Sequence, residues 1–202
     1  MRHYGYARAV PAIGLSALLA VATARAQGGT LVVADFDAGK TETVAGLSLP
    51  VISDEQLGGP STATLTLVSP GAQSSRAALR IGFEIADGFT RPFSSVWALL
   101  GEKGLATDLT AFKGLRFYAR SSAGAYSAAV SQLGSQVRPS AVFEVKPEWT
   151  LVELPFERFR SGPPGSPSPA LETKAVTSIG FSIAPSLRGR FDLDIDQVEF
   201  YK

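Results

Sequence analysis

Short runs of β-branched and aromatic residues, each closed by Gly, Pro, Ser or Asp, recur along this chain and constrain its fold more than any other feature. In the run EWTLVELPFERF, at residues 148–159, side chains alternate between two faces: Trp149, Leu151 and Glu153 on one, and Thr150, Val152 and Leu154 on the other. Such alternation is typical of a pleated strand with one buried face. No segment carries a clear apolar stripe at helical period. The sequence therefore predicts an all-β fold.

The spacing of these runs predicts an antiparallel β-sandwich of jelly-roll type. We predict strands at Leu31–Phe36, Thr62–Val68, Ala77–Ile85, Phe93–Ala98, Gly114–Arg120, Tyr126–Gln132, Ala141–Val145, Trp149–Leu154, Val176–Ile183 and Phe191–Tyr201.

Alternation also assigns faces within the strands. In the last strand, Leu193 and Ile195 fall out of register with Val198 and Phe200, which predicts a β-bulge near residues 196–197. Two further strands place the following residues on one face: Leu79, Ile81, Phe83 and Ile85 in the first, and Leu115, Phe117 and Ala119 in the second.

Residues 1–26 resemble a cleaved signal peptide. Arg2 and Arg8 precede an apolar run, residues 9–22, and cleavage after Ala26 would follow small residues. A membrane anchor is the alternative, but the run falls short of the roughly 20 apolar residues that span a bilayer. A mitochondrial presequence is the other alternative, although the stretch is more continuously apolar than an amphipathic presequence. We therefore expect a secreted or periplasmic protein with one domain over residues 27–202 and no membrane span after cleavage.

The charge of the remaining chain argues against a nucleic-acid partner. Removing the leader leaves 16 Lys and Arg against 18 Asp and Glu, a net charge near −2. Nucleic-acid binders carry a basic face instead. The chain has no cysteine, so its core must hold without disulfides.

The residue types left after leader removal exclude most catalytic devices. His3 is the only histidine, cysteine is absent, and asparagine does not occur. Ser-His-Asp and Cys-His catalysis and His/Cys zinc sites are therefore excluded, and we predict that the protein is not an enzyme. A glycosidase carboxylate pair is the alternative, but its candidates fall mostly on outward faces or turns: Glu84, Asp87, Glu144, Glu148 and Glu153.

Several short motifs, taken in order, resemble one family. They are VADFD (33–37), ISDEQLGGPS (52–61), DLTAFKGLRFYAR (108–120), EWTLVELPFERF (148–159), SIGFSI (178–183) and the terminal FDLDIDQVEF. Their order resembles the complex I intermediate-associated protein 30 domain, which is similar to a carbohydrate-binding module family with a galactose-binding jelly-roll fold. The chain departs from the family pattern in the Glu-Gln-Leu link at residues 55–57.

The resemblance implies a structural calcium at a terminal corner of the jelly roll. Calcium takes several carboxylate and carbonyl oxygens. Asp35, Asp37 and Asp196 would meet if the first and last strands are neighbours. The alternative is that these residues cap turns and face water. Gly58, Gly59 and Ser61 are explained by a turn alone.

Sugar sites combine an aromatic platform with a few polar groups. We predict a ligand-binding face from side chains on three strands, provided that these strands adjoin: Trp97, Arg116, Tyr118, Arg120, Tyr126 and Gln132. The alternative is that the tryptophans belong to the core, which we expect for Trp149.

These observations predict a non-catalytic secreted binding module. Its ligand is expected to be a glycan or an envelope polysaccharide. The alternative is a protein-interaction or assembly factor that uses the same sheet face to hold a protein partner.

Overall fold

The computed structural model describes residues 26–27, 29–122, 124–162, 168–184 and 186–202. The predicted leader at residues 1–26 lies, apart from Ala26, outside this described part. Among the residues that are described, no helix has the length and hydropathy of a membrane-spanning segment.

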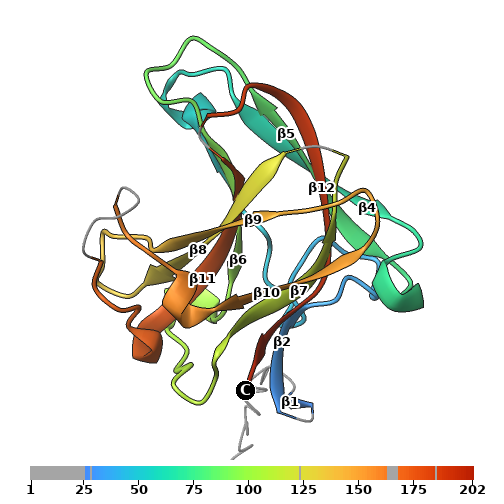
Figure 1. Cartoon of the computed structure of the whole chain (residues 1–202), viewed down its shortest axis with the longest axis vertical. Coiled ribbons are helices and arrows are strands. Elements are labelled where there is room, and N and C mark those ends of the chain that lie inside the picture. Colours follow the sequence, from blue (N-terminus) through green and yellow to red (C-terminus); the bar gives the residue numbers. More distant parts are fainter. Residues whose placement is uncertain (1–25, 28, 123, 163–167, 185) are drawn as a thin grey trace, which may run out of the picture.

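The described residues form two antiparallel sheets joined by loops and short 3-10 turns (Figure 1). The strands are β1 (Ala26–Gln27), β2 (Thr30–Ala34), β3 (Val51–Ser53), β4 (Thr62–Val68), β5 (Ala78–Ile85), β6 (Ser94–Leu99), β7 (Gly114–Arg120), β8 (Ala125–Gln132), β9 (Ser140–Glu144), β10 (Thr150–Pro155), β11 (Val176–Ile183) and β12 (Gly189–Tyr201). The 3-10 turns are η1 (Asp54–Leu57), η2 (Ala72–Ser74), η3 (Glu102–Gly104), η4 (Phe156–Arg158) and η5 (Thr173–Ala175).

The long strand β12 organises the seven-stranded sheet. It pairs with β5 and β2 on one side and with β7 on the other, while β4 extends the sheet beyond β5 and β10 extends it beyond β7. The second sheet has the order β3-β6-β11-β8-β9. Consecutive strands repeatedly change sheets, as in jelly rolls.

The core lies between the two sheets and is filled by the predicted alternating side chains. In β5 the side chains at 79, 81, 83 and 85 are buried, and in β7 those at 115, 117 and 119 are buried, which confirms both face assignments. Phe117 makes edge-to-face contacts with Phe143 and Phe181, each with ring centroids 5.1 Å apart. Such aromatic pairs add to the stabilisation by buried area.

The predicted bulge is present in β12. Asp196 pairs with Tyr118, but the next pair is Glu199 with Arg116, so β12 contains one extra residue. Gln197 has φ 49°, in the left-handed region that one type of bulge uses at its first residue. Beyond it, the strand returns Val198 to the core.

All ten predicted strands are present, with small shifts at their ends. The prediction missed two short strands, β1 and β3. The three residues of β3 are too few to show alternation. The expectation that Trp149 is a core residue was wrong. It is half-buried just before β10, and the Arg120 guanidinium lies 4.5 Å from its ring centroid.

Candidate functional site

The predicted sugar platform is divided between the two sheets. Tyr118 lies on β7 in the seven-stranded sheet, whereas Trp97 lies on β6 and Tyr126 on β8 in the five-stranded sheet. The condition that these strands adjoin is therefore not met, because β7 pairs with β12 and β10 and the chain crosses to the other sheet before β8. No single surface contains all of the predicted ligand residues.

The two predicted arginines of β7 are held in ion pairs. Arg116 and Arg120 share the outer face of β7 with Tyr118, as the alternation predicted. Arg116 Nε lies 2.6 Å from Glu199 Oε1, and Arg120 Nε lies 2.8 Å from Asp194 Oδ2. These contacts join neighbouring strands, so both side chains already have partners in the sheet.

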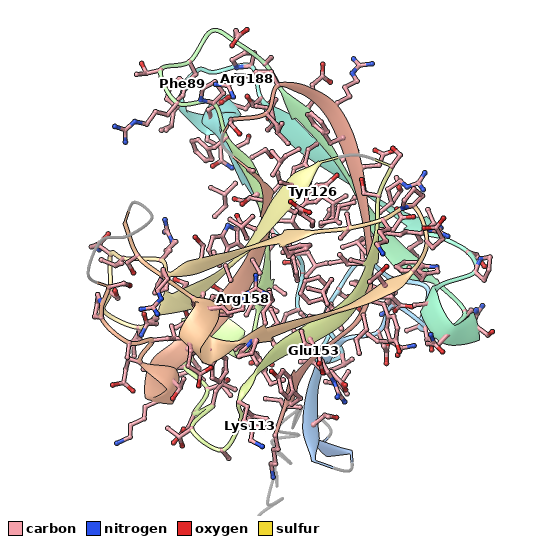
Figure 2. The ribbon with its side chains drawn as sticks, viewed as in Figure 1. Phe89, Lys113, Tyr126, Glu153, Arg158 and Arg188 are labelled. Atoms are coloured by element: carbon pink, nitrogen blue, oxygen red, sulfur yellow. The ribbon has the colours of Figure 1, made fainter. Side chains whose placement is uncertain are left out.

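The two predicted residues of β8 turn away from the outer face of their sheet. Tyr126 is fully buried inside the sandwich (Figure 2), and its hydroxyl lies 2.8 Å from Ser121 Oγ and donates to the Asp192 carbonyl. Burial raises the pKa of Tyr126. Gln132, at the end of the strand, donates through Nε2 to the Glu172 carbonyl. The expectation that Tyr126 contacts a ligand is corrected, because its side chain is fully buried, whereas Gln132 remains partly exposed at the end of β8.

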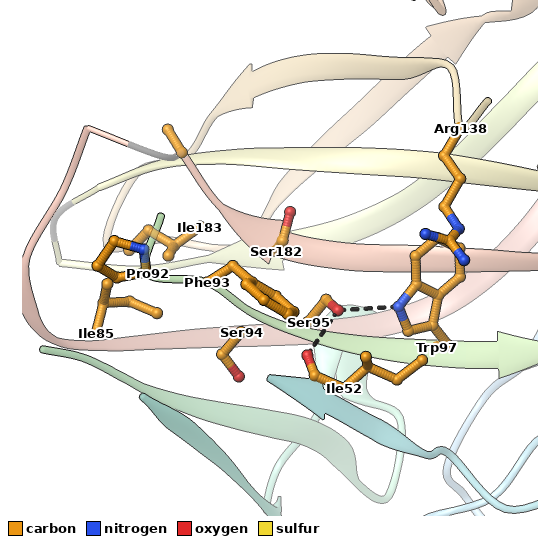
Figure 3. A pocket seen from close by; sticks show the side chains of 11 residues that line it. Ile52, Ile85, Pro92, Phe93, Ser94, Ser95, Trp97, Arg138, Ser182 and Ile183 are labelled. Carbon is orange, nitrogen blue, oxygen red and sulfur yellow. Dashed lines mark hydrogen bonds between the residues drawn. The ribbon is translucent and has the colours of Figure 1, made fainter. Parts of the chain in front are cut away.

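Trp97 occupies the outer face of the five-stranded sheet. Its neighbours Val96 and Ala98 belong to the core, so alternation turns Trp97 outward. The indole Nε1 donates to Ser95 Oγ at 2.9 Å, and Ser95 Oγ donates to the Ile52 carbonyl at 2.9 Å (Figure 3). This chain of hydrogen bonds fixes the ring on the sheet.

Small side chains form the floor beside Trp97. A row of hydroxyls crosses three strands, because Ser182 of β11 is the register partner of both Ser95 and Ser127. Ser127 Oγ and Ser182 Oγ lie 2.8 Å apart. In the next row, Trp97 is paired with Gly180 and Gly180 with Ala129. The outer face of this sheet therefore carries only small side chains in these two rows of β8 and β11, and the bulky Trp97 side chain lies beside them on β6.

A pocket of about 240 Å³ lies at this end of the sheet (Figure 3). Its lining includes Phe93, Trp97 and Arg138, together with serines and aliphatic side chains. The Arg138 guanidinium lies 5.5 Å from the centroid of the Trp97 ring. Ser94 also lines the pocket, and among the described residues its buried hydroxyl has no hydrogen-bond partner. Apolar surface with a few polar groups is typical of small-ligand sites.

The Asp-to-Gly-Gly-Pro-Ser motif supports the wall of this pocket. Asp54 is fully buried, and its carboxylate accepts the backbone N–H of Ser61 at 2.7 Å and that of Phe93 at 2.9 Å. Burial alone would raise the pKa of Asp54, but the hydrogen bonds from Ser61 and Phe93 outweigh it and leave the pKa lowered. A Cβ at Gly59 would lie 2.4 Å from Asp54 Oδ1, which explains that glycine. Gly58 has φ 87°, as the predicted turn requires.

The three aspartates predicted to bind calcium are engaged with protein donors. Asp196 is fully buried and accepts Ala72 N–H, Gln197 N–H and the Ser75 hydroxyl. Burial raises the pKa of Asp196, although these hydrogen bonds act in the opposite direction.

Asp37 accepts the backbone N–H groups of Arg76 and Ala77, and Asp35 accepts that of Asp37. Within the described ranges, no group of three or more acidic, His or Cys side chains could hold a metal ion. Because N–H and O–H donors point at these oxygens, the arrangement does not fit a calcium ligand set.

Sequence reasoning identified Trp97 but missed the other residues of the pocket. The alternation in SIGFSI could have placed Gly180 and Ser182 outward, opposite the buried Ile179 and Phe181. Arg138 lies in the loop between β8 and β9, where no periodicity identifies it. Phe93 was assigned to a strand, but it precedes β6 and lies at the pocket wall.

A sequence model of the complex I intermediate-associated protein 30 (CIA30) family matches residues 36–195. A search of curated proteins found no match.

Solved structures with a similar fold include carbohydrate-binding modules. A family 11 module from Clostridium thermocellum, in complex with a β-1,3-1,4-mixed-linked tetrasaccharide, has 18% identity and a TM-score of 0.65 over 87% of this chain and 97% of that one. A family 30 module of the C. thermocellum cellulase Cel9D-Cel44B has 14% identity and a TM-score of 0.52 over 69% and 82% of the two chains. At these identities the similarity shows the fold alone, and it confirms the predicted jelly-roll sandwich.

Proposed function

The chain belongs to the complex I intermediate-associated protein 30 family, and from this premise we propose that it is a non-catalytic module that binds a glycan on the outer face of its five-stranded sheet. The observation that carries the proposal is the position of Trp97. Its ring lies flat on a floor of small residues, beside a row of hydroxyls and a pocket of about 240 Å³. An aromatic ring matches the apolar face of a pyranose, and hydroxyls can exchange hydrogen bonds with the sugar.

The chemistry of the pocket supports binding without catalysis. In the part of the chain that the structure describes, its lining residues include no carboxylate, and the full sequence has no cysteine and only His3 as a histidine. General acid–base or nucleophilic catalysis would need such groups within reach of the ligand. The hydroxyls of Ser95 and Ser182, on the same outer face as Trp97, offer a ligand hydrogen-bond partners instead.

The similarity of fold to carbohydrate-binding modules supports a glycan as the ligand class. A family 11 module of the same fold is known in complex with a tetrasaccharide. This support is an analogy of fold, and one fold can host many functions.

A glycan array with matched tryptophan variants tests the proposal. Trp97→Ala should abolish retention, whereas Trp149→Ala, on the other sheet, should retain the ligand. Circular dichroism and a thermal melt would check that both variants fold. If Tyr118→Ala rather than Trp97→Ala removed binding, the ligand would lie on the seven-stranded sheet. If no glycan were retained, the proposal would fail.

Exposed apolar side chains favour a protein partner as the second candidate. On the face that carries Trp97, Ile52, Phe93 and Val142 are 39%, 37% and 55% exposed. Apolar surface of this kind can mark a protein interface. Under this alternative, Ile52→Asp and Val142→Asp would abolish capture of a protein from the native envelope, and the glycan array would be silent.

We also propose that the protein is exported. The support is the leader pattern of Arg2 and Arg8 before the apolar run, with Ala26 at the cleavage point. Fractionation of the producing cells, followed by N-terminal sequencing, should find a periplasmic or secreted form that begins at Gln27. A form that keeps residues 1–26 would contradict cleavage.

A further inference from the structure

Among the described residues, the lining of the pocket beside Trp97 carries a single formal charge. It contains aliphatic, aromatic, proline and serine residues, and Arg138 is the one ionic side chain of that described lining. Asp54 contributes to the pocket wall only through the backbone N–H of Phe93, since its carboxylate is buried and hydrogen-bonded to protein donors. The electrostatic environment that a ligand meets in this pocket is therefore positive.

Arg138 differs from the arginines that stabilise the sheets. Arg80, Arg116, Arg120, Arg188 and Arg190 each lie within ion-pair distance of a carboxylate. None of the ion pairs of the described residues involves Arg138. Its side chain is exposed and reaches from the β8–β9 loop toward the indole (Figure 3).

Arg138 also covers the ring that a sugar would use. One face of the Trp97 indole lies on Gly180, the guanidinium lies near the ring at 5.5 Å, and only 8% of the residue is exposed. A sugar that stacks on Trp97 must therefore displace Arg138. That displacement gives up the cation–π contact between the guanidinium and the indole.

A neutral sugar offers the displaced guanidinium little in return, whereas a carboxylate offers a charge-assisted, bidentate hydrogen bond. Resting on the proposed glycan-binding function, we propose that the ligand is an anionic glycan of the uronate class and that Arg138 binds its carboxylate. The ligand then draws Arg138 away from the indole and stacks on the exposed ring. Ser95, Ser127 and Ser182 retain acceptor capacity for the sugar hydroxyls.

Paired polymers that differ only in charge test this inference. The probes are polygalacturonate, polymannuronate and polyglucuronate, each beside its fully methyl-esterified form, which is neutral on the same backbone. The purified protein should retain at least one acid polymer and release its ester. Retention should weaken as salt rises, because salt screens an exposed charge pair. Binding should also change the fluorescence of Trp97.

Arginine variants locate the charge. Arg138→Gln should weaken binding of the retained acid polymer by about 10- to 100-fold, as expected for the loss of a hydrogen bond between charged groups. Arg138→Lys should recover part of that loss, since it restores the charge without the planar fork. Arg190→Gln is the matched control, because Arg190 lies on the other sheet.

The outcomes separate this inference from the proposed function. If acid and ester bind equally, if only neutral glycans bind, or if Arg138→Gln binds as the parent does, the anionic ligand is refuted while glycan binding stands. If neither the acid nor the neutral probes bind and the glycan array is silent, both proposals fail.

Discussion

The indole of Trp97 lies directly against the backbone of Gly180, its register partner on β11. A Cβ built at Gly180 would lie 2.7–2.8 Å from three atoms of the ring, closer than real Cβ contacts come. The absence of a side chain at position 180 is therefore what lets the ring lie flat on the sheet. A flat ring presents its face, and not its edge, to a ligand.

Gly180→Ala should lift the ring from the sheet. We expect a loss of about 1–3 kcal/mol in the free energy of unfolding, as for other overpacked sites, together with a change in tryptophan fluorescence. Urea denaturation measures the loss. In a Trp97→Leu background the same substitution should be neutral or slightly stabilising, because alanine is better than glycine in a strand. An equal loss in both backgrounds would contradict a ring contact.

The sequence predicted burial well because burial depends on local alternation. The side chains of β5 and β7 fall where their parity places them, and even the bulge at Gln197 was visible as a change of register. Which strands become neighbours is not local. Tyr118 and Tyr126 are only eight positions apart in the chain, yet they lie on different sheets, one half-buried and one in the core.

The candidate site depends on the same non-local information. Alternation could place Trp97 outward, but it could not place its ring against Gly180, which lies 83 positions later in the chain. Arg138 reaches the ring from a loop, and the buried Asp54 holds Phe93, 39 positions away. Such partners are set by the packing of the sandwich, and no period in the sequence encodes them.

Asp194 is expected to contribute more to the free energy of unfolding than the exposed carboxylates do. It is almost buried, and it accepts from Arg80 on one neighbouring strand and Arg120 on the other, at 2.7 and 2.8 Å. Asp194→Asn would leave two guanidinium groups side by side. Breaking a buried pair costs about 3–5 kcal/mol; because both arginines are 30–40% exposed, we expect about 1–3 kcal/mol by urea denaturation.

The matched control is Asp87→Asn. Asp87 pairs with Arg188 but is 91% exposed, so its loss should change the free energy of unfolding by less than about 0.5 kcal/mol. Higher salt should reduce the loss in Asp194→Asn, because salt screens the repulsion between the two arginines. Equal losses in the two variants would show that the Arg80–Asp194–Arg120 arrangement adds no more than an exposed pair.

Calcium can be tested directly against the hydrogen bonding of the three aspartates. Asp37 and Asp196 already hold the 72–77 segment through its N–H and O–H donors. We therefore expect thermal melts with millimolar calcium and with a chelator to coincide. A bound ion would instead raise the Tm with calcium concentration by mass action. Such a rise would restore the calcium site that the sequence predicted.

The stability contributed by Asp54 should depend on pH in a defined window. Its folded-state pKa lies below the ordinary value of 3.8, because hydrogen bonds from Ser61 and Phe93 outweigh the effect of burial. A lowered pKa means that the folded state favours the carboxylate. The contribution is therefore fully present above about pH 3.8 and is lost as pH falls through the folded pKa.

Asp54→Asn tests this window and the link to the pocket together. The amide would turn an NH₂ group toward one of the two backbone donors, and an unsatisfied buried N–H costs about 1–3 kcal/mol. Urea denaturation should find that gap at pH 7 and a narrowing gap as pH falls below 3.8 and through the folded pKa, where the folded parent protein also loses its carboxylate. Because Asp54 holds Phe93 at the pocket wall, the variant should also lose ligand affinity at pH 7. A stability gap that stays constant down to pH 2 would mean that the carboxylate charge does not carry the contribution of Asp54.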